Sequence, residues 1–195
     1  MVQPDTPISS VTESADIAAL RAKAEQGDAD AQAALGRAYY RGEGVSKDLV
    51  EAAKWFRKAA EQGNAKAQYN LGCAYVRSEG VTKNFIEAVK WFRASADQGC
   101  ANAQSDLGYA YSRGDGVSQD LAEAVKWWLK AADQGYAKAQ LNLGYAYARG
   151  EGVTKDVDEG IKWFNKAAKQ GHPDTKIPRI IRNWIRSLKF RIFGI

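Results

Sequence analysis

Histidine, cysteine and long apolar stretches are scarce in this chain of 195 residues, and each scarcity excludes a class of function. The single histidine, His172, stands between a predicted helix end and a proline, so we interpret it as a loop residue rather than a catalytic base. No group of cysteine and histidine residues has the spacing of metal ligands, and no glycine-rich phosphate loop follows a predicted strand. We therefore expect no enzyme activity, no metal and no cofactor.

No apolar run in the sequence is long enough to cross a membrane. The start of the chain also lacks the charged and apolar segments of a secretory signal. Residues 1–13 are polar and contain no aromatic residue, so we expect them to be disordered. The sequence as given predicts a cytoplasmic protein, although a periplasmic or secreted protein whose signal had been removed would give the same pattern.

What the sequence contains in abundance is one segment of 36 residues, repeated four times. Each copy ends in a Gln-Gly pair, and a partial copy precedes the first. The four copies occupy residues 28–63, 64–99, 100–135 and 136–171. A fixed period of this length is typical of supersecondary units that stack on one another.

The first half of each copy predicts an amphipathic helix. In the second copy its apolar stripe consists of Ala67, Leu71, Ala74 and Tyr75. A turn with two glycines ends this helix in three of the copies. In the second copy Ser78 replaces the first of the two glycines, so we expect Gly80 to adopt the left-handed backbone angle there.

The second half of each copy predicts another helix, with a clear start signal. Each start has an Asp or Asn followed three residues later by Glu, which resembles a capping box in which the Glu reaches back to the amide of the cap. The four pairs are Asp48 with Glu51, Asn84 with Glu87, Asp120 with Glu123, and Asp156 with Glu159. A Gln-Gly pair ends the helix, because glycine readily forms a left-handed C-terminal cap.

Small and aromatic residues recur at fixed positions and predict where the two helices touch. A glycine stands inside each first helix, where it costs about 1 kcal/mol relative to alanine, so we expect a close approach of the second helix there. These glycines are Gly36, Gly72, Gly108 and Gly144, and we expect Phe56, Phe92, Trp128 and Phe164 beside them. The neighbouring Trp55, Trp91, Trp127 and Trp163 favour packing between repeats over a ladder of ligand-binding aromatic residues.

The repeated pattern reads A-x-A-Q-x-x-L-G-x-A-Y-x-x-G-x-G-V, then E-A-x-K-W-F and A-x-Q-G, and it resembles the Sel-1-like repeat, a relative of the tetratricopeptide repeat. The resemblance covers Asp28 to Gly171. It implies an all-α fold, an α-solenoid that forms a right-handed superhelix of stacked antiparallel helix pairs. It also implies a non-catalytic scaffold or adaptor for other proteins. We expect residues 14–27 to form an N-terminal capping helix and residues 172–195 a C-terminal one.

In the related tetratricopeptide fold the first helices line the concave face, and the resemblance places the partner-binding residues there. They are Arg37, Tyr40, Arg41, Lys66, Tyr69, Arg77, Tyr109, Arg113, Lys138, Leu141, Tyr145 and Arg149. Tyrosine and arginine are enriched in binding hot spots. We also expect Ala33 and Ser105, at positions equivalent to Leu141, to be exposed on this face.

One arginine recurs at the end of every first helix, and two interpretations of it stay open. The four residues are Arg41, Arg77, Arg113 and Arg149. A cation at a helix C-terminus gains about 0.3–1 kcal/mol from the helix dipole, which would make the arginines structural. Alternatively, they form a ladder that grips an acidic peptide or a C-terminal carboxylate.

The final segment, residues 172–195, carries the whole excess charge of the chain, which is formally +5. Residues 1–171 contain equal numbers of basic and acidic side chains, so the repeats lack the basic stripe of a nucleic-acid-binding protein. The segment predicts an amphipathic helix with isoleucines on one face and arginines on the other. It would cap the open end of the solenoid, lie on a membrane surface, or bind a partner.

Two alternative functions accompany the scaffold interpretation. A cysteine-rich, secreted branch of the resembled family is linked to β-lactam binding or hydrolysis, and it places a bridging cysteine pair in each repeat. Cys73 and Cys100 lie in different copies, so we expect no disulfide, and the Ser-x-x-Lys motif of serine β-lactamases does not occur. The other alternative is a peripheral membrane adaptor that docks through residues 172–195. For the scaffold we expect a monomer whose partner is a protein or peptide, and not a nucleic acid, with a membrane surface as a possible further contact of residues 172–195.

Overall fold

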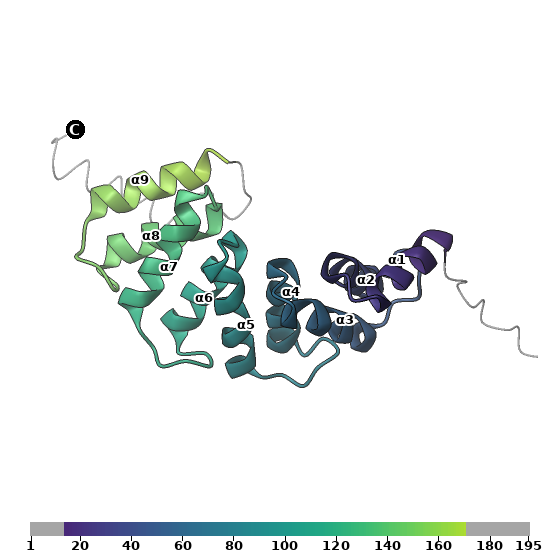
Figure 1. Ribbon diagram of the computed structural model, residues 1–195. Coiled ribbons are helices and arrows are strands. Elements are labelled where there is room, and N and C mark those ends of the chain that lie inside the picture. The colour runs from purple at the N-terminus through teal and green to yellow at the C-terminus, as the bar shows by residue number, and fades with distance from the viewer. Residues whose placement is uncertain (1–13, 171–195) are drawn as a thin grey trace, which may run out of the picture. The chain divides into compact units, whose positions relative to one another are not determined.

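The structure, a computed structural model, describes residues 14–170, and in this range the chain forms nine α-helices and no strand (Figure 1). In chain order they are α1 (Ala15–Glu25), α2 (Ala29–Arg41), α3 (Leu49–Glu61), α4 (Ala65–Arg77), α5 (Phe85–Asp97), α6 (Ala101–Arg113), α7 (Leu121–Asp133), α8 (Ala137–Arg149) and α9 (Val157–Ala168). The expected all-α class is confirmed. The disorder predicted for residues 1–13 and the helix predicted within 172–195 fall outside the described residues, so both stay predictions.

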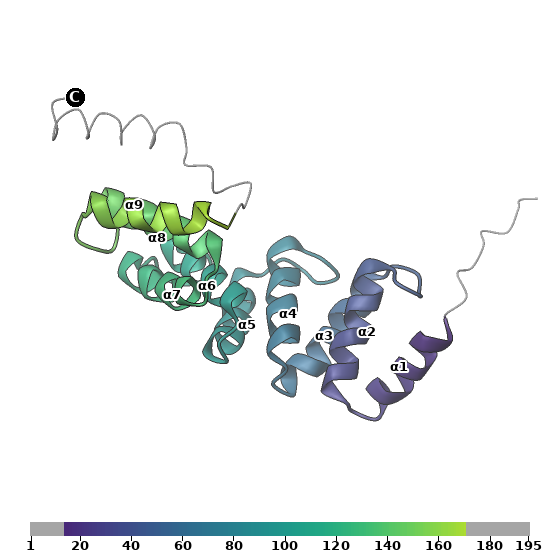
Figure 2. The same ribbon diagram turned by 90° about the horizontal axis from the view of Figure 1, so that it is seen from above.

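The chain divides into two compact units, and each stacks helices that are neighbours in sequence. The first contains α1 to α5, the start of α6 up to Ala103, and loop residues 115–117; the second contains the rest of α6 and α7 to α9. In the first unit α1 packs on α2, α2 on α3, α3 on α4 and α4 on α5. In the second unit α7 packs on α8, and α8 on α9. Figure 2 shows the succession of α1, α2, α3 and α4 from above, and this stacking of helix pairs is the predicted α-solenoid architecture.

Helix α1 takes the place that a second helix would have before the first repeat. The side chain of Gln32 in α2 donates a hydrogen bond from Nε2 to the carbonyl oxygen of Ala24 in α1, at 3.0 Å. One repeat later, Gln68 makes the same bond to the carbonyl oxygen of Ala60 in α3, at 3.1 Å. The packing of α1 on α2 therefore repeats the packing of α3 on α4.

A ladder of glutamines, to which the sequence pattern assigned no role, joins the ends of the helices. Each buried glutamine in a first helix accepts a hydrogen bond from the glutamine that ends the second helix of its own repeat. The bonds run from Nε2 of Gln62 to Oε1 of Gln32 (2.7 Å), and likewise from Gln98 to Gln68, Gln134 to Gln104 and Gln170 to Gln140 (2.8 Å each). Buried amides have their partners in this way, which avoids the cost of burying them unbonded.

The predicted contact between glycine and aromatic residue is confirmed in all four repeats. A Cβ built on Gly36 would lie 2.7 Å from Cδ1 of Phe56, and on Gly72 it would lie 2.6 Å from Cδ1 of Phe92. Gly108 and Gly144 meet Trp128 and Phe164 at the same distance of 2.6 Å. The four recurring tryptophans, Trp55, Trp91, Trp127 and Trp163, are buried, which confirms their assignment to packing.

The capping boxes predicted for the second helices are only half formed. Asp48 caps α3 by accepting the amide N–H of Glu51 at 2.9 Å, as expected. Its own amide, however, donates to the carbonyl oxygen of Tyr39 at 3.0 Å, so Glu51 has no donor to reach back to. Glu51 instead pairs with Lys54 at 3.0 Å, and the other three repeats make the equivalent ion pair. This ion pair raises the pKa of the exposed Lys54 ammonium, chiefly through its hydrogen bond to Glu51.

The turn that follows each first helix also differs in one respect from the prediction. Gly80 does adopt the left-handed region, with φ of +72°, but Ser78 adopts it as well, with φ of +60°. The serine ends α4 in the conformation that Gly42 and Gly150 adopt after α2 and α8. The end of the first helix therefore requires a left-handed residue, and Ser78 adopts this conformation at some cost in free energy because it is not glycine.

Candidate functional site

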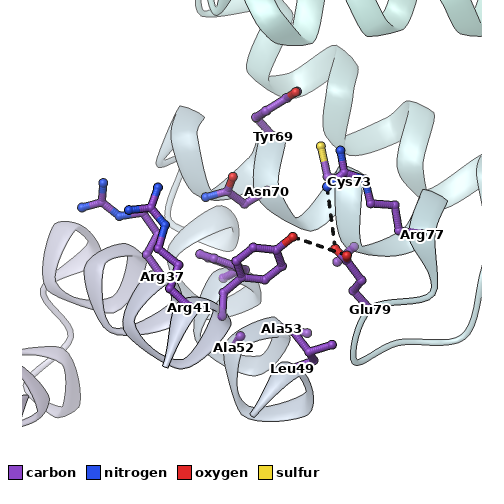
Figure 3. Close-up of a pocket in the computed structure, with 13 residues that line it drawn as sticks. Arg37, Arg41, Leu49, Ala52, Ala53, Tyr69, Asn70, Cys73, Arg77 and Glu79 are labelled. Atoms are coloured by element: carbon purple, nitrogen blue, oxygen red, sulfur yellow. Dashed lines mark hydrogen bonds and ion pairs between the residues drawn. The ribbon is translucent and has the colours of Figure 1, made fainter. Parts of the chain in front are cut away.

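A cavity of about 180 Å³ opens in the first unit, between the first helices of two adjacent repeats (Figure 3). Helices α2 and α4 form its walls, and α3 forms its floor. The polar and aromatic lining residues are Arg37, Tyr40 and Arg41 from α2, Phe56 from α3, Tyr69, Asn70, Cys73 and Arg77 from α4, and Glu79 from the turn after α4. Figure 3 shows Arg37 and Arg41 together on one wall, with Cys73 and Arg77 on the other.

The second unit contains a cavity of about 290 Å³ in the equivalent place, between α6 and α8 with α7 beneath. Its lining residues are Tyr109, Ser112, Leu121, Trp128, Asn142, Tyr145, Ala146, Arg149 and Glu151. Each of them stands two repeats after a residue that lines the first cavity, as Arg149 stands two repeats after Arg77. The cavity is therefore a product of the repeat geometry, because equivalent residues line it in both units.

Hydrogen bonds and ion pairs hold the rim of the first cavity. The hydroxyl of Tyr40 donates to Oε1 of Glu79 at 3.3 Å, and the guanidinium of Arg77 lies 4.0 Å from the other oxygen of that carboxylate. Partial burial of Arg77 works against its charged form, but the neighbouring Cys73 and Glu79 more than offset this, so the pKa of the guanidinium is raised. Arg77 is thus a fixed positive charge at every physiological pH.

The recurring arginines at the helix ends have local acidic neighbours. Arg41 lies 3.4 Å from Glu43, and Arg149 lies 3.6 Å from Glu151, in each case two residues further along the chain. Arg113 and Arg149 also lie over the rings of Tyr109 and Tyr145, at 5.8 and 5.3 Å from the ring centroids. These side chains stay largely exposed, so both the helix-end interpretation and the peptide-binding interpretation remain open.

Most of the predicted site residues lie at the surface, and eight of them line the two cavities. Those eight are Arg37, Tyr40, Arg41, Tyr69, Arg77, Tyr109, Tyr145 and Arg149. Lys66, Arg113 and Lys138 are exposed but do not line either cavity. Lys138 instead forms an ion pair with Asp106 at 3.4 Å.

The exposure predicted for Leu141 is wrong. Its side chain is 8% exposed and packs against Phe164 and Ala167 of α9. The equivalent Ala33 and Ser105 are also buried, contrary to expectation. This helix position faces the second helix of its own repeat rather than solvent, and only Tyr69, with its longer side chain, reaches the cavity from it.

The sequence did not predict the acidic and amide side chains that line the cavities. Glu79 and Glu151 stand inside the glycine turn, which the pattern identified only as a connection between helices. Asn70 and Asn142 stand two residues before the helix glycine, among apolar neighbours, and this placement was a signal that could have marked them. In the second unit the side-chain nitrogen of Asn142 is buried and has no hydrogen-bond partner among residues 14–170.

Other kinds of site were sought among residues 14–170. No group of histidine, cysteine, aspartate or glutamate side chains there could hold a metal ion. Within the same range, no helix combines the length and the apolar character that crossing a bilayer requires. Cys73 and Cys100 are not joined in a disulfide.

The two tyrosines of the second cavity are expected to differ in their contribution to stability. Tyr145 meets the ring of Phe164 edge-on with centroids 5.1 Å apart, whereas Tyr109 is 47% exposed. Tyr145→Ala should therefore lower the free energy of unfolding by about 1–3 kcal/mol, and Tyr109→Ala by less than about 0.5 kcal/mol. Urea unfolding of both variants measures the difference, and equal losses would contradict this account of Tyr145.

Comparison with protein families gives a match over most of the chain. A family model described as the Sel1 repeat matches residues 29–64, 65–100, 101–136 and 137–172. These segments agree, with a shift of one residue, with the four copies seen in the sequence. No curated protein matches the chain.

Solved structures of several bacterial proteins share the fold. A protective antigen present in uropathogenic Escherichia coli strains, displaying an SLR fold, is 43% identical, with a TM-score of 0.79 over 83% of this chain and 35% of that one. The present chain thus spans about a third of the length of that antigen. A Sel1 repeat protein from Oxalobacter formigenes is 36% identical, with a TM-score of 0.77 over 87% of this chain and 74% of that one. The cysteine-rich protein B of Helicobacter pylori is 27% identical, with a TM-score of 0.53 over 69% of this chain and 96% of that one.

Proposed function

This chain belongs to the Sel1 repeat family, and from that premise we propose that it is a non-catalytic scaffold that binds a peptide or a domain of another protein. Proteins of this family commonly act as scaffolds for protein interactions. In each unit the proposed binding face is the one formed by its first helices, on which its cavity opens. The chain would act as a monomer, with its partner as its only ligand.

The recurrence of the cavity in both units carries this proposal. Each cavity has an arginine and a glutamate at its rim and a tyrosine in its wall. The rim pairs are Arg77 with Glu79 and Arg149 with Glu151. Tyrosine and arginine dominate the energetics of protein interfaces because they offer large contact areas together with polar ends. Neighbouring residues at the wall differ between the two units, which would allow each cavity to select a different partner side chain.

The sizes of the cavities favour a partner side chain over a small-molecule ligand. Ligand pockets generally measure about 300–1,000 Å³, and the two cavities measure about 180 and 290 Å³. A peptide laid across the first helices could insert one residue into such a depression while its main chain stays at the rim. The surrounding surface would then supply contacts that exclude water.

Selection from a library of random peptides displayed on phage, with binding then measured on synthetic peptides, tests the proposal. We expect selected peptides to lose at least about five-fold in affinity with either Arg77→Ala in the first cavity or Tyr109→Ala in the second. Ile86→Ala is the matched control, because this apolar side chain on α5 is 70% exposed and lines neither cavity. Failure to recover any peptide, or an equal loss with the control, would refute the proposed binding face.

A further inference from the structure

The cavity of the first unit carries more positive than negative charge. Arg37, Arg41 and Arg77 line it, and Glu79 is the only acidic side chain among its lining residues. Lys47 lies close by, with its ammonium 5.9 Å from the ring centroid of Tyr40. The equivalent cavity in the second unit is balanced, since Arg149 and Glu151 are its only charged lining residues.

Arg37 and Arg41 together give this difference, because Tyr109 replaces Arg37 in the second cavity and Arg113, the equivalent of Arg41, does not line it. The three later repeats place Cys73, Tyr109 and Tyr145 at the position of Arg37, so only the first repeat has a cation there. Arg41 has Glu43 at 3.4 Å and Arg77 has Glu79 at 4.0 Å, whereas Arg37 forms no ion pair with any residue between 14 and 170. Arg37 is exposed, and it lines the cavity from α2, as Figure 3 shows.

An anion beside Arg37 would offset a small repulsion between two arginines. Arg37 and Arg41 are four residues apart on α2, on one face of the helix, and like charges at this spacing repel each other. Figure 3 shows the two side chains side by side on the same wall of the cavity. A carboxylate between them would remove the repulsion, and it would accept the paired N–H groups that a guanidinium presents.

We propose that the cavity of the first unit binds a glutamate or aspartate side chain of an acidic peptide segment, with Arg37 as the residue that sets this preference. The inference deepens the proposed scaffold function and rests on it. Glu79, which is held by Tyr40 and Arg77, lines the cavity on the side away from Arg37 (Figure 3). A nucleic acid fits less well, because residues 1–171 as a whole carry equal numbers of acidic and basic side chains.

Binding of a fluorescein-labelled hexaglutamate peptide, followed by anisotropy, tests this preference, with hexaglutamine as the neutral probe. At about 50 mM salt, where screening is weak, hexaglutamate should bind and hexaglutamine should not. Arg37→Gln should weaken hexaglutamate binding about five-fold. Lys23→Gln removes the same charge from α1, away from the cavity, and should change the affinity by less than about 1.5-fold.

The site of binding can be located with the thiol of Cys73, which lines the same cavity. Bound hexaglutamate should slow the alkylation of Cys73 by iodoacetamide, measured by mass spectrometry of proteolytic fragments. Cys100, which lines neither cavity, is the internal control and should react at an unchanged rate. If hexaglutamate slowed the alkylation of both thiols, its effect would not be confined to this cavity, and the result would contradict binding there.

Two outcomes would overturn the acidic preference. One is equal binding of hexaglutamate and hexaglutamine, and the other is the same loss of affinity for Arg37→Gln as for Lys23→Gln. Phage-selected peptides whose affinity falls with Arg77→Ala but not with Arg37→Gln would also contradict the acidic preference. Such peptides would still support the scaffold function. Failure of the scaffold function itself gives a different result, because no peptide would then depend on Arg77 or Tyr109.

Discussion

Replacement of Gly108 by leucine is expected to lower the free energy of unfolding by about 3–5 kcal/mol. A Cβ at this position would lie 2.6 Å from Cδ1 and Nε1 of Trp128 and 3.0 Å from the carbonyl oxygen of Ala124. The buried indole ring has to move to admit any side chain, and overpacking of this kind costs about 1–3 kcal/mol. Its movement also breaks the hydrogen bond from Nε1 to the carbonyl oxygen of Ser105, 3.2 Å long, which adds about 1–3 kcal/mol.

Asn102→Leu is the matched control for this substitution. Asn102 lies on the same helix and is exposed, so a leucine there meets no neighbour and slightly improves helix propensity. Urea unfolding followed by circular dichroism should show a large loss for Gly108→Leu and almost none for Asn102→Leu. Equal stability of the two variants would mean that Trp128 does not fill the space above Gly108.

Gly152→Ala is expected to destabilise the second unit far more than Gly135→Ala, although both glycines have left-handed backbone angles. Gly152 has φ of +73° and Gly135 has φ of +83°, so each alanine suffers a similar conformational cost of about 1–2 kcal/mol. The surroundings differ, because a Cβ on Gly152 would lie 2.2 Å from the carbonyl oxygen of Leu121, and a Cβ on Gly135 would have nothing within 4 Å. The turn after α8 rests directly on the first residue of α7, and backbone cannot yield as a side chain can.

The expected loss is more than about 3 kcal/mol for Gly152→Ala and about 1–2 kcal/mol for Gly135→Ala. Chemical denaturation of the two variants under the same conditions measures the difference directly. A similar loss at both positions would show that conformational strain alone explains the glycine requirement. A larger loss at Gly152 would instead identify the contact with α7 as the reason that the turn needs glycine.

The consequences for binding follow from the same repeat geometry. The helix glycines and the turn glycines fix how the first helices stack, and the cavities lie where one first helix stacks beside the next. Gly36, in contact with Phe56, therefore positions the wall that carries Arg37 and Tyr40. Substitutions at the glycines should abolish binding through loss of structure, whereas Arg37→Gln should alter preference in a folded protein.

The sequence by itself determined the helices, their pairing and the contacts that recur in every repeat. Helix positions follow from local pattern, because the stripe from Ala67 to Tyr75 and the caps such as Asp48 act within a few residues of one another. The contact of Gly72 with Phe92 was also predictable, because a costly glycine and a bulky aromatic residue recur together in all four copies. The period of 36 residues repeats the same helix pair and the same internal contacts. The pairs then stack, because one helix pair cannot bury its own apolar faces.

Which polar and apolar groups meet depends on how the helices pack, and the sequence pattern did not predict it. The amide N–H of Asp48 donates a hydrogen bond to the carbonyl oxygen of Tyr39, and Glu51 therefore pairs with Lys54. The tertiary structure buried Leu141 against Phe164, since the facing of one helix position depends on the tilt of its neighbour and not on the sequence period alone. It also brought Glu79 to the hydroxyl of Tyr40, 39 residues away, and left Arg37 unpaired by any described residue in the lining of the same cavity. Contacts of this kind depend on side-chain geometry within and between repeats, which hydrophobic periodicity does not encode.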